Sequence, residues 1–139
     1  MILLDTNVLS ELMRPRPDGA VLAWIDSHDP EELWSWTVVA AEVLSGLDLM
    51  PDGRRQEELR AKAEHMFSTL FADRIYDFDL RGARALGTIM KTRKRIGRPM
   101  DEMDALIAAT AHVNGAQLAT RNTSDFEHCG VVLIDPWSS

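Results

Sequence analysis

Cysteine is almost absent from this chain, and long hydrophobic segments are absent altogether. The single cysteine, Cys129, has no second cysteine for an internal disulfide, which favours a reducing compartment. No apolar run approaches the roughly 18 residues that a membrane-spanning helix needs. Met1 leads directly into Ile-Leu-Leu-Asp, without the basic segment or cleavage site of a secretory signal. We therefore expect a cytoplasmic protein that does not enter a membrane.

Basic side chains are also scarce, with 15 Lys and Arg against 22 Asp and Glu, so the net charge is -7. This charge opposes RNA binding, because most non-specific affinity comes from basic side chains that neutralise phosphates. Carboxylates that bind a divalent cation, however, reverse their local charge. Several of the basic residues also cluster in one stretch, namely Lys91, Arg93, Lys94, Arg95 and Arg98. A nucleic-acid substrate is therefore not excluded.

What the chain does contain is typical of one folded domain covering residues 1–139, with 45% hydrophobic and 27% charged residues. Apolar strands are expected at 2–4, 33–36, 75–78, 117–120 and 131–134. Helices are expected at 8–13, 19–28, 38–50, 54–72, 80–96 and 101–114, with Thr37 as the N-cap of the third. The alternation predicts an α/β fold with a central, mostly parallel sheet covered on both faces.

Functional groups in such sheets collect beyond the carboxyl ends of the strands. Asp5 directly follows the first strand, although an Asp there also serves as a helix N-cap. Asp104 lies in an otherwise apolar helix, although its place in the first turn also suits the helix dipole. Asn122 and Asp125 follow the strand at 117–120, in a segment that taken alone is an ordinary polar turn.

Glu42 is a further acid on a helix face that it shares with Val38, Val39 and Gly46. We expect these carboxylates to be buried near apolar surface, which costs several kcal/mol each unless something compensates their charge. No Lys or Arg lies three or four residues from Glu42 or Asp104. A hard divalent cation, Mg²⁺ or Mn²⁺, accounts for such a cluster better than a salt bridge does.

Four blocks of the sequence carry a family resemblance. They are Met1-Ile-Leu-Leu-Asp-Thr-Asn, the segment 38–46 around Glu42, Asp104-Ala-Leu-Ile-Ala-Ala-Thr-Ala, and Ala119-Thr-Arg-Asn-Thr-Ser-Asp-Phe. In this order, and over nearly the whole chain, they resemble the PIN-domain ribonucleases. Among these the chain is most similar to VapC-type toxins of toxin–antitoxin systems, in their FitB-like branch. Four blocks in sequence are a far more specific signal than any one of them.

The resemblance implies a three-layer α/β/α PIN-like domain that cleaves phosphodiester bonds of single-stranded RNA with Mg²⁺ or Mn²⁺. It implies the toxin of a type II pair, held inactive by a cognate antitoxin. Asp5 and Asp104 match the principal metal ligands, and Glu42 matches the third acid. Many members carry an Asp where this chain has Asn122, and here Asp125 is the nearby acid. We therefore expect Asn122 and Asp125 to share the fourth position of the site.

Other residues are assigned to substrate and partners. Thr6 and Thr120 are predicted to hydrogen-bond a ligand carboxylate or the scissile phosphate, and Arg98 to contact the RNA. The residues 91–95 are predicted to guide the RNA backbone or to form a solvated helix face. By analogy with the family, a homodimer or an antitoxin helix is expected at the apolar region of Leu44, Leu47, Leu49 and Met50.

Three alternatives remain. A phosphatase with an Asp nucleophile generally needs a second Asp two residues later, where this chain has Asn7. A receiver-like domain needs a Lys late in the chain, yet the last one is Lys94. A PIN-like domain that binds metal or RNA without cleaving it is opposed only by the retention of the three acids.

Overall fold

The computed structural model describes residues 1–138, and a parallel sheet forms its centre. The strands are β1 (Ile2–Leu4), β2 (Leu33–Trp36), β3 (Ile75–Tyr76), β4 (Gln117–Ala119) and β5 (Leu133–Ile134). Their order across the sheet is β3-β2-β1-β4-β5, and every pairing is parallel. β1 is first in the chain but central in the sheet, because it pairs with β2 on one side and β4 on the other. The predicted parallel sheet is confirmed.

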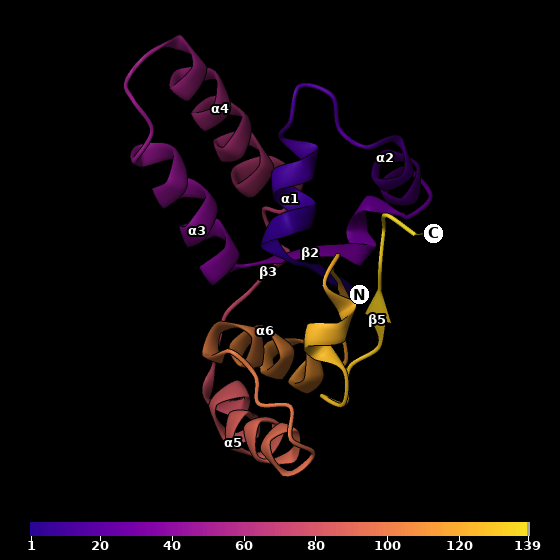
Figure 1. Cartoon of the computed structure of the whole chain (residues 1–139). Helices are drawn as coiled ribbons and strands as arrows, with labels where there is room; N and C mark the ends of the chain where they lie inside the picture. The colour runs from indigo at the N-terminus through magenta and orange to yellow at the C-terminus, as the bar shows by residue number, and fades with distance from the viewer. Residues whose placement is uncertain (139) are drawn as a thin grey trace.

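Helices cover both faces of this sheet (Figure 1). On one side lie α1 (Thr6–Leu12), α2 (Gly19–Asp26), α3 (Thr37–Asp48) and α4 (Arg54–His65), and on the other α5 (Leu80–Arg95) and α6 (Glu102–Val113). Short 3-10 turns occupy Pro30–Glu32 and Thr123–Phe126. The three-layer α/β/α architecture is therefore confirmed. In the described part of the chain, no helix has the length and apolarity needed to cross a membrane.

The apolar run of β1 lies at the bottom of the core. Leu3 and Leu4 are completely buried, as is Leu118 on the neighbouring β4. Side chains on both faces of a strand are buried when helices cover both faces, so a central parallel strand is apolar at successive positions. The next residue, Asp5, is the first polar group beyond this run, and it stands at the carboxyl edge of the sheet.

Aspartates begin four of the α-helices, whereas the predicted cap Thr37 does not. Asp5, Asp18, Asp79 and Asp101 each accept a hydrogen bond from a backbone N–H two or three residues later, at 2.8–3.2 Å. The prediction for Thr37 was wrong, since Thr37 is the first residue of α3 and Trp36 is its N-cap, without a side-chain capping bond. β2 runs directly into α3, so the last residue of the strand has to occupy the cap position.

The helix predicted over 54–72 changes its geometry after His65. Residues Met66–Leu70 form a π-helical turn in which the Phe71 N–H donates to the Met66 carbonyl at 2.9 Å. The wider turn adds a residue, so the inward position moves from residue 70 to residue 71. Phe71 is 6% exposed, whereas Leu70, which the helical period places on the buried face, is 51% exposed.

Candidate metal and RNA site

The carboxyl end of β1 opens into a small acidic pocket of about 170 Å³. Its walls come from the start of α1, from α3, from α6 and from the turn after β4. Its apolar lining includes Trp36, Val39 and Ile107. Its polar lining brings together five of the predicted site residues, namely Asp5, Thr6, Glu42, Asp104 and Asn122. Residues that are distant in the chain therefore converge where the topology places the functional edge of the sheet.

Asp5 is the deepest acid of the pocket. It is 8% exposed, and burial raises the pKa of its carboxyl group above the ordinary value of 3.8. Hydrogen bonds from the Thr120 side chain and from the backbone of Val8 and Asn7 lower this pKa, and the nearby charge of Glu42 raises it. The capping role considered for Asp5 is real, yet it leaves the carboxylate in the wall of the pocket.

Glu42 lies at the mouth of the pocket and is exposed. The prediction that it is buried among apolar neighbours was therefore wrong. Val39, one turn earlier on α3, forms part of the pocket wall. The Glu42 carboxylate lies at the open side of the pocket and contacts solvent. The Thr6 hydroxyl donates to the Glu42 carboxylate at 2.8 Å. This bond ties the first turn of α1 to α3 across the pocket.

Asp104 lies opposite, on the first turn of α6, and is half-buried. Burial raises the pKa of its carboxyl group, and the charges of Asp101, Asp125 and Asp5 raise it further. Neither Asp5 nor Asp104 has an ion-pair partner among the described residues. The helix dipole suits an acid here, but it does not account for two shielded carboxylates that repel each other.

The fourth position of the site is formed by the turn after β4. The Asn122 side chain lines the pocket, and its backbone N–H donates to the Thr120 hydroxyl at 3.1 Å. Asp125 does not line the pocket, but its charge acts on Asp104. Both residues therefore lie near the site, as expected, and Asn122 is the one that faces the cavity.

The residues predicted to bind substrate are placed differently from one another. Thr6 lines the pocket. Thr120 is completely buried and hydrogen-bonds Asp5, which fits a carboxylate partner and leaves no surface for a substrate. Arg98 lies outside the pocket lining, where its guanidinium donates to the Glu127 carboxylate at 2.7 Å and to the Ser124 carbonyl at 2.9 Å.

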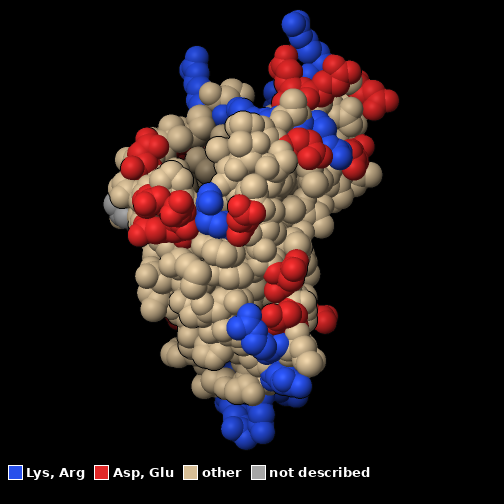
Figure 2. Space-filling model, turned by 180° about the vertical axis from the view of Figure 1, so that it is seen from behind, with Lys and Arg blue, Asp and Glu red and all other residues tan. Residues whose placement is uncertain are grey.

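The basic stretch of α5 divides into two groups. Lys91, Lys94 and Arg95 are exposed, and Figure 2 shows Lys and Arg gathered at the end of the molecule where α5 lies. Arg93, by contrast, is 4% exposed. Its inclusion in an RNA-guiding surface was therefore wrong, because a run of charges in the sequence does not show that one member points inward.

The pocket suits a divalent cation that keeps part of its water shell. Among residues 1–138, no three or more His, Cys, Asp or Glu side chains form a group that holds an ion by itself. Mg²⁺ is usually bound through one or two carboxylates, with water or substrate phosphates completing its coordination. Asp5 and Asp104 supply two such carboxylates without a basic partner, and Glu42 and Asn122 offer further oxygens on the same pocket.

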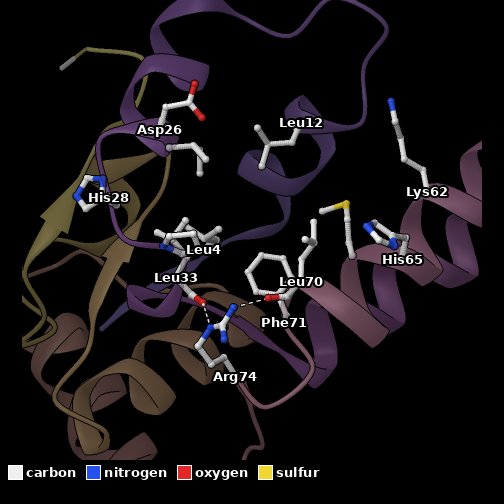
Figure 3. Close-up of a pocket in the computed structure, with 13 residues that line it drawn as sticks. Leu4, Leu12, Asp26, His28, Leu33, Lys62, His65, Leu70, Phe71 and Arg74 are labelled. Carbon is white, nitrogen blue, oxygen red and sulfur yellow. Dashed lines mark hydrogen bonds between the residues drawn. The ribbon is translucent and has the colours of Figure 1, made fainter.

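Two larger hollows lie nearby. A cavity of about 500 Å³ between α1, α2 and the π-helical turn has walls of Leu4, Leu12 and Phe71 and one carboxylate, Asp26 (Figure 3). It lacks the paired acids that a cation needs. A groove of about 520 Å³ between α1, α3 and α4 is more relevant, because it shares Thr6 and Glu42 with the acidic pocket.

Comparison with known proteins identifies the family. The model of the PIN domain matches residues 2–131. The chain belongs to the PIN-domain family. It is 42% identical to VapC ribonuclease Y4jK of Sinorhizobium fredii, over 99% of this chain and 98% of that one, and 37% identical to toxin FitB of Neisseria gonorrhoeae, over 99% of both. The fold is similar to that in the crystal structure of FitAcB from Neisseria gonorrhoeae, with a TM-score of 0.93 and 37% identity over the full length of both chains.

Proposed function

We propose that this PIN-domain chain is a metal-dependent endoribonuclease and the toxin of a toxin–antitoxin pair. One observation carries the proposal. Asp5 and Asp104, from distant parts of the chain, line the same pocket as shielded carboxylates, and neither forms an ion pair in the described residues. The names of the similar chains, a ribonuclease and a toxin, support the same activity.

The acids of the pocket have separate roles in this proposal. Asp5 and Asp104 would hold Mg²⁺ or Mn²⁺, and Glu42 and the Asn122–Asp125 turn would orient a water molecule in the pocket. A divalent cation held there neutralises charge at a scissile phosphate and makes an attacking water more acidic. In the proposed reaction a water molecule adds to phosphorus and releases a proton to solvent, the bond to the 3′-oxygen breaks, and the 3′-oxygen takes up a proton. The products are a 5′-phosphate and a 3′-hydroxyl.

The groove beside the pocket supplies a path for the RNA strand. It continues from Thr6 and Glu42 toward Arg14 and Arg55, over an apolar floor. Arg14 is already paired with Glu11 at 3.0 Å, whereas Arg55 has no ion pair in the part of the chain that the structure describes. Arg55 is therefore the residue that we assign to a phosphate of bound RNA.

A cognate antitoxin is the proposed partner, because the similar chain FitB is named a toxin and chains of this fold have been solved in toxin–antitoxin complexes. A homodimer is also proposed. The predicted apolar region is only partly available for either contact, since Leu47 is buried in the core while Leu49 is 86% exposed at the end of α3.

The test is cleavage of a mixed RNA pool by purified protein with Mg²⁺, Mn²⁺ or EDTA, followed by mapping of the product ends. We expect cleavage with the metals, none in EDTA, and none for Asp104→Asn. The matched control is Asp18→Asn, which makes the same change at the exposed N-cap of α2, outside the pocket lining. Because Asn also caps helices well, the control should keep full activity.

Three outcomes distinguish the alternatives. Cleavage that persists in EDTA and in Asp104→Asn contradicts the proposed site. Mg²⁺ binding and RNA binding without any product, at every RNA tested, identify a PIN-like domain that has lost cleavage. Products with 5′-hydroxyl ends contradict the proposed direction of attack.

A further inference from the structure

A buried arginine contacts the turn that forms one wall of the acidic pocket. Arg93, in the last turn of α5, is 4% exposed and directs its guanidinium at three backbone carbonyls. Its Nε donates to the Arg98 carbonyl at 2.6 Å, and its Nη1 donates to the carbonyls of Asp125 and Glu127, both at 2.8 Å. Two of these three acceptors belong to the turn that follows β4.

Such an arrangement is unusual for a buried charge. A buried guanidinium is normally paired with a carboxylate, because neutral carbonyls do not cancel its charge. No carboxylate forms an ion pair with Arg93 in the described ranges. The charge of Arg93 lowers the pKa of Asp104 in the acidic pocket, although burial and neighbouring acids raise it more, and it also lowers the pKa of Glu127.

The turn that Arg93 holds is short, and Phe126 anchors it in the core. It is a 3-10 turn of four residues, Thr123–Phe126, whose N-cap Asn122 forms no side-chain capping bond. Arg98 adds a second tether, through the Ser124 carbonyl and the Glu127 carboxylate. The two arginines therefore fix the carbonyl groups of the turn, while the Asp125 side chain remains exposed and acts on Asp104.

We propose that Arg93 is a positioning residue of the metal site, which holds the turn 122–127 against the acidic pocket that Asn122 and Phe126 line, and thereby keeps the Asp125 carboxylate within reach of the cation. The inference rests on the proposed function, because it assigns Asp125 to the outer coordination of the same cation. A lysine cannot replace Arg93, since an ammonium group is a compact point charge and lacks the planar fork that reaches acceptors on several sides.

The experiment measures Mg²⁺ binding by the rise in melting temperature, alongside RNA cleavage. We expect Arg93→Lys to raise the Mg²⁺ concentration for half of the maximal rise by about tenfold, as is usual when an outer partner of a metal site is removed. The matched control is Arg95→Lys, the same change on the same helix at an exposed position. The control should match the wild type.

A double substitution separates positioning from general stability. If Arg93 acts through Asp125, then Arg93→Lys should change the half-maximal Mg²⁺ concentration less than about twofold in an Asp125→Asn background. An Arg93→Lys variant that melts at a lower temperature but binds Mg²⁺ like the wild type overturns the inference. The same tenfold loss in both backgrounds overturns it too.

Removal of a buried guanidinium can prevent folding, so Asp125→Asn alone supplies a second test at an exposed residue. It must weaken Mg²⁺ binding by itself, and unchanged binding overturns the inference whatever happens to Arg93→Lys. A wild type that shows no response to Mg²⁺ overturns the proposed function as well. If the wild type cleaves RNA and Arg93→Lys binds Mg²⁺ as the wild type does, this inference alone is overturned.

Discussion

The hydroxyl of Thr6 donates a hydrogen bond to the carboxylate of Glu42 at 2.8 Å, joining residues 36 positions apart. Thr6 directly follows the deepest acid of the pocket, and Glu42 is the acid at its open mouth. The bond therefore fixes the exposed carboxylate at the mouth of the pocket relative to the sheet. Without it, Glu42 would sample the rotamers of an exposed side chain.

The first prediction concerns this bond. Thr6→Val should reduce the rate of RNA cleavage about tenfold, because Glu42 loses its anchor, while Thr6→Ser should retain most of the rate since it keeps the hydroxyl. The free energy of unfolding should fall by only about 1 kcal/mol, the usual worth of one hydrogen bond. Single-turnover cleavage and urea unfolding measure the two effects. Equal rates for Val and Ser would show that the bond has no role in the reaction.

The second prediction concerns the metal. Mg²⁺ should raise the melting temperature of the wild type, because a ligand that binds only the folded state stabilises it. Asp5→Asn should lose most of this rise. Asp18→Asn makes the same change at the N-cap of α2, outside the pocket lining, and should behave as the wild type does. A full rise in Asp5→Asn, measured by calorimetry, would place the cation elsewhere.

The third prediction concerns pH in the absence of metal. Burial raises the pKa of Asp5 above 3.8, so the folded protein holds this proton more tightly than the unfolded chain does. The proton is present in both states at low pH, and the ionised form destabilises the fold as pH rises through the raised pKa. Relative to the wild type, Asp5→Asn should therefore become more stable as pH increases.

Urea unfolding in EDTA, from about pH 4 to pH 8, measures this difference. Asp104→Asn should show the same direction, because burial raises the pKa of Asp104 too. Saturating Mg²⁺ should remove the advantage of the Asp5→Asn variant. A stability difference that shrinks as pH rises would contradict the assigned direction of the pKa shift.

The fourth prediction compares two adjacent arginines at the start of α4. Arg55 lines the groove, whereas Arg54 is paired with Glu58 at 3.3 Å and its side chain is 92% exposed. Arg55→Gln should raise KM by roughly threefold with kcat unchanged, which is the size expected of an exposed ion pair. Its salt dependence should lose about 0.7 in slope, the value for one phosphate of a single strand. Arg54→Gln should do neither, and identical behaviour of the two variants would remove the groove from the RNA path.

Local patterns predicted the sheet and most of the acidic pocket. Ile2–Leu4 is apolar at successive positions because the strand is covered on both faces, and that alone places Asp5 at the functional edge. Asp104 was recognisable because an acid interrupts an apolar helix. Both predictions use the hydrophobicity of the neighbouring residues in the sequence, which indicates a central strand or a core helix.

Other features depend on geometry that neighbours do not report. The neighbours of Glu42 identify its helix face, but they do not show that this face opens to solvent at the mouth of the pocket. Leu70 is exposed and Phe71 is buried because a single wide turn shifts the helical phase. Arg93 was predicted to lie on the surface with its basic neighbours, because its three carbonyl acceptors lie in turns whose folded position the sequence does not specify.

The central place of β1 has a consequence for synthesis. β1 gains β4 as its neighbour only after the chain has been synthesised beyond Gln117, where β4 begins. During translation the pocket around Asp5 therefore forms only after Asp104 and the turn that follows β4 have left the ribosome. A nascent chain that has not yet reached the turn after β4 has no assembled pocket.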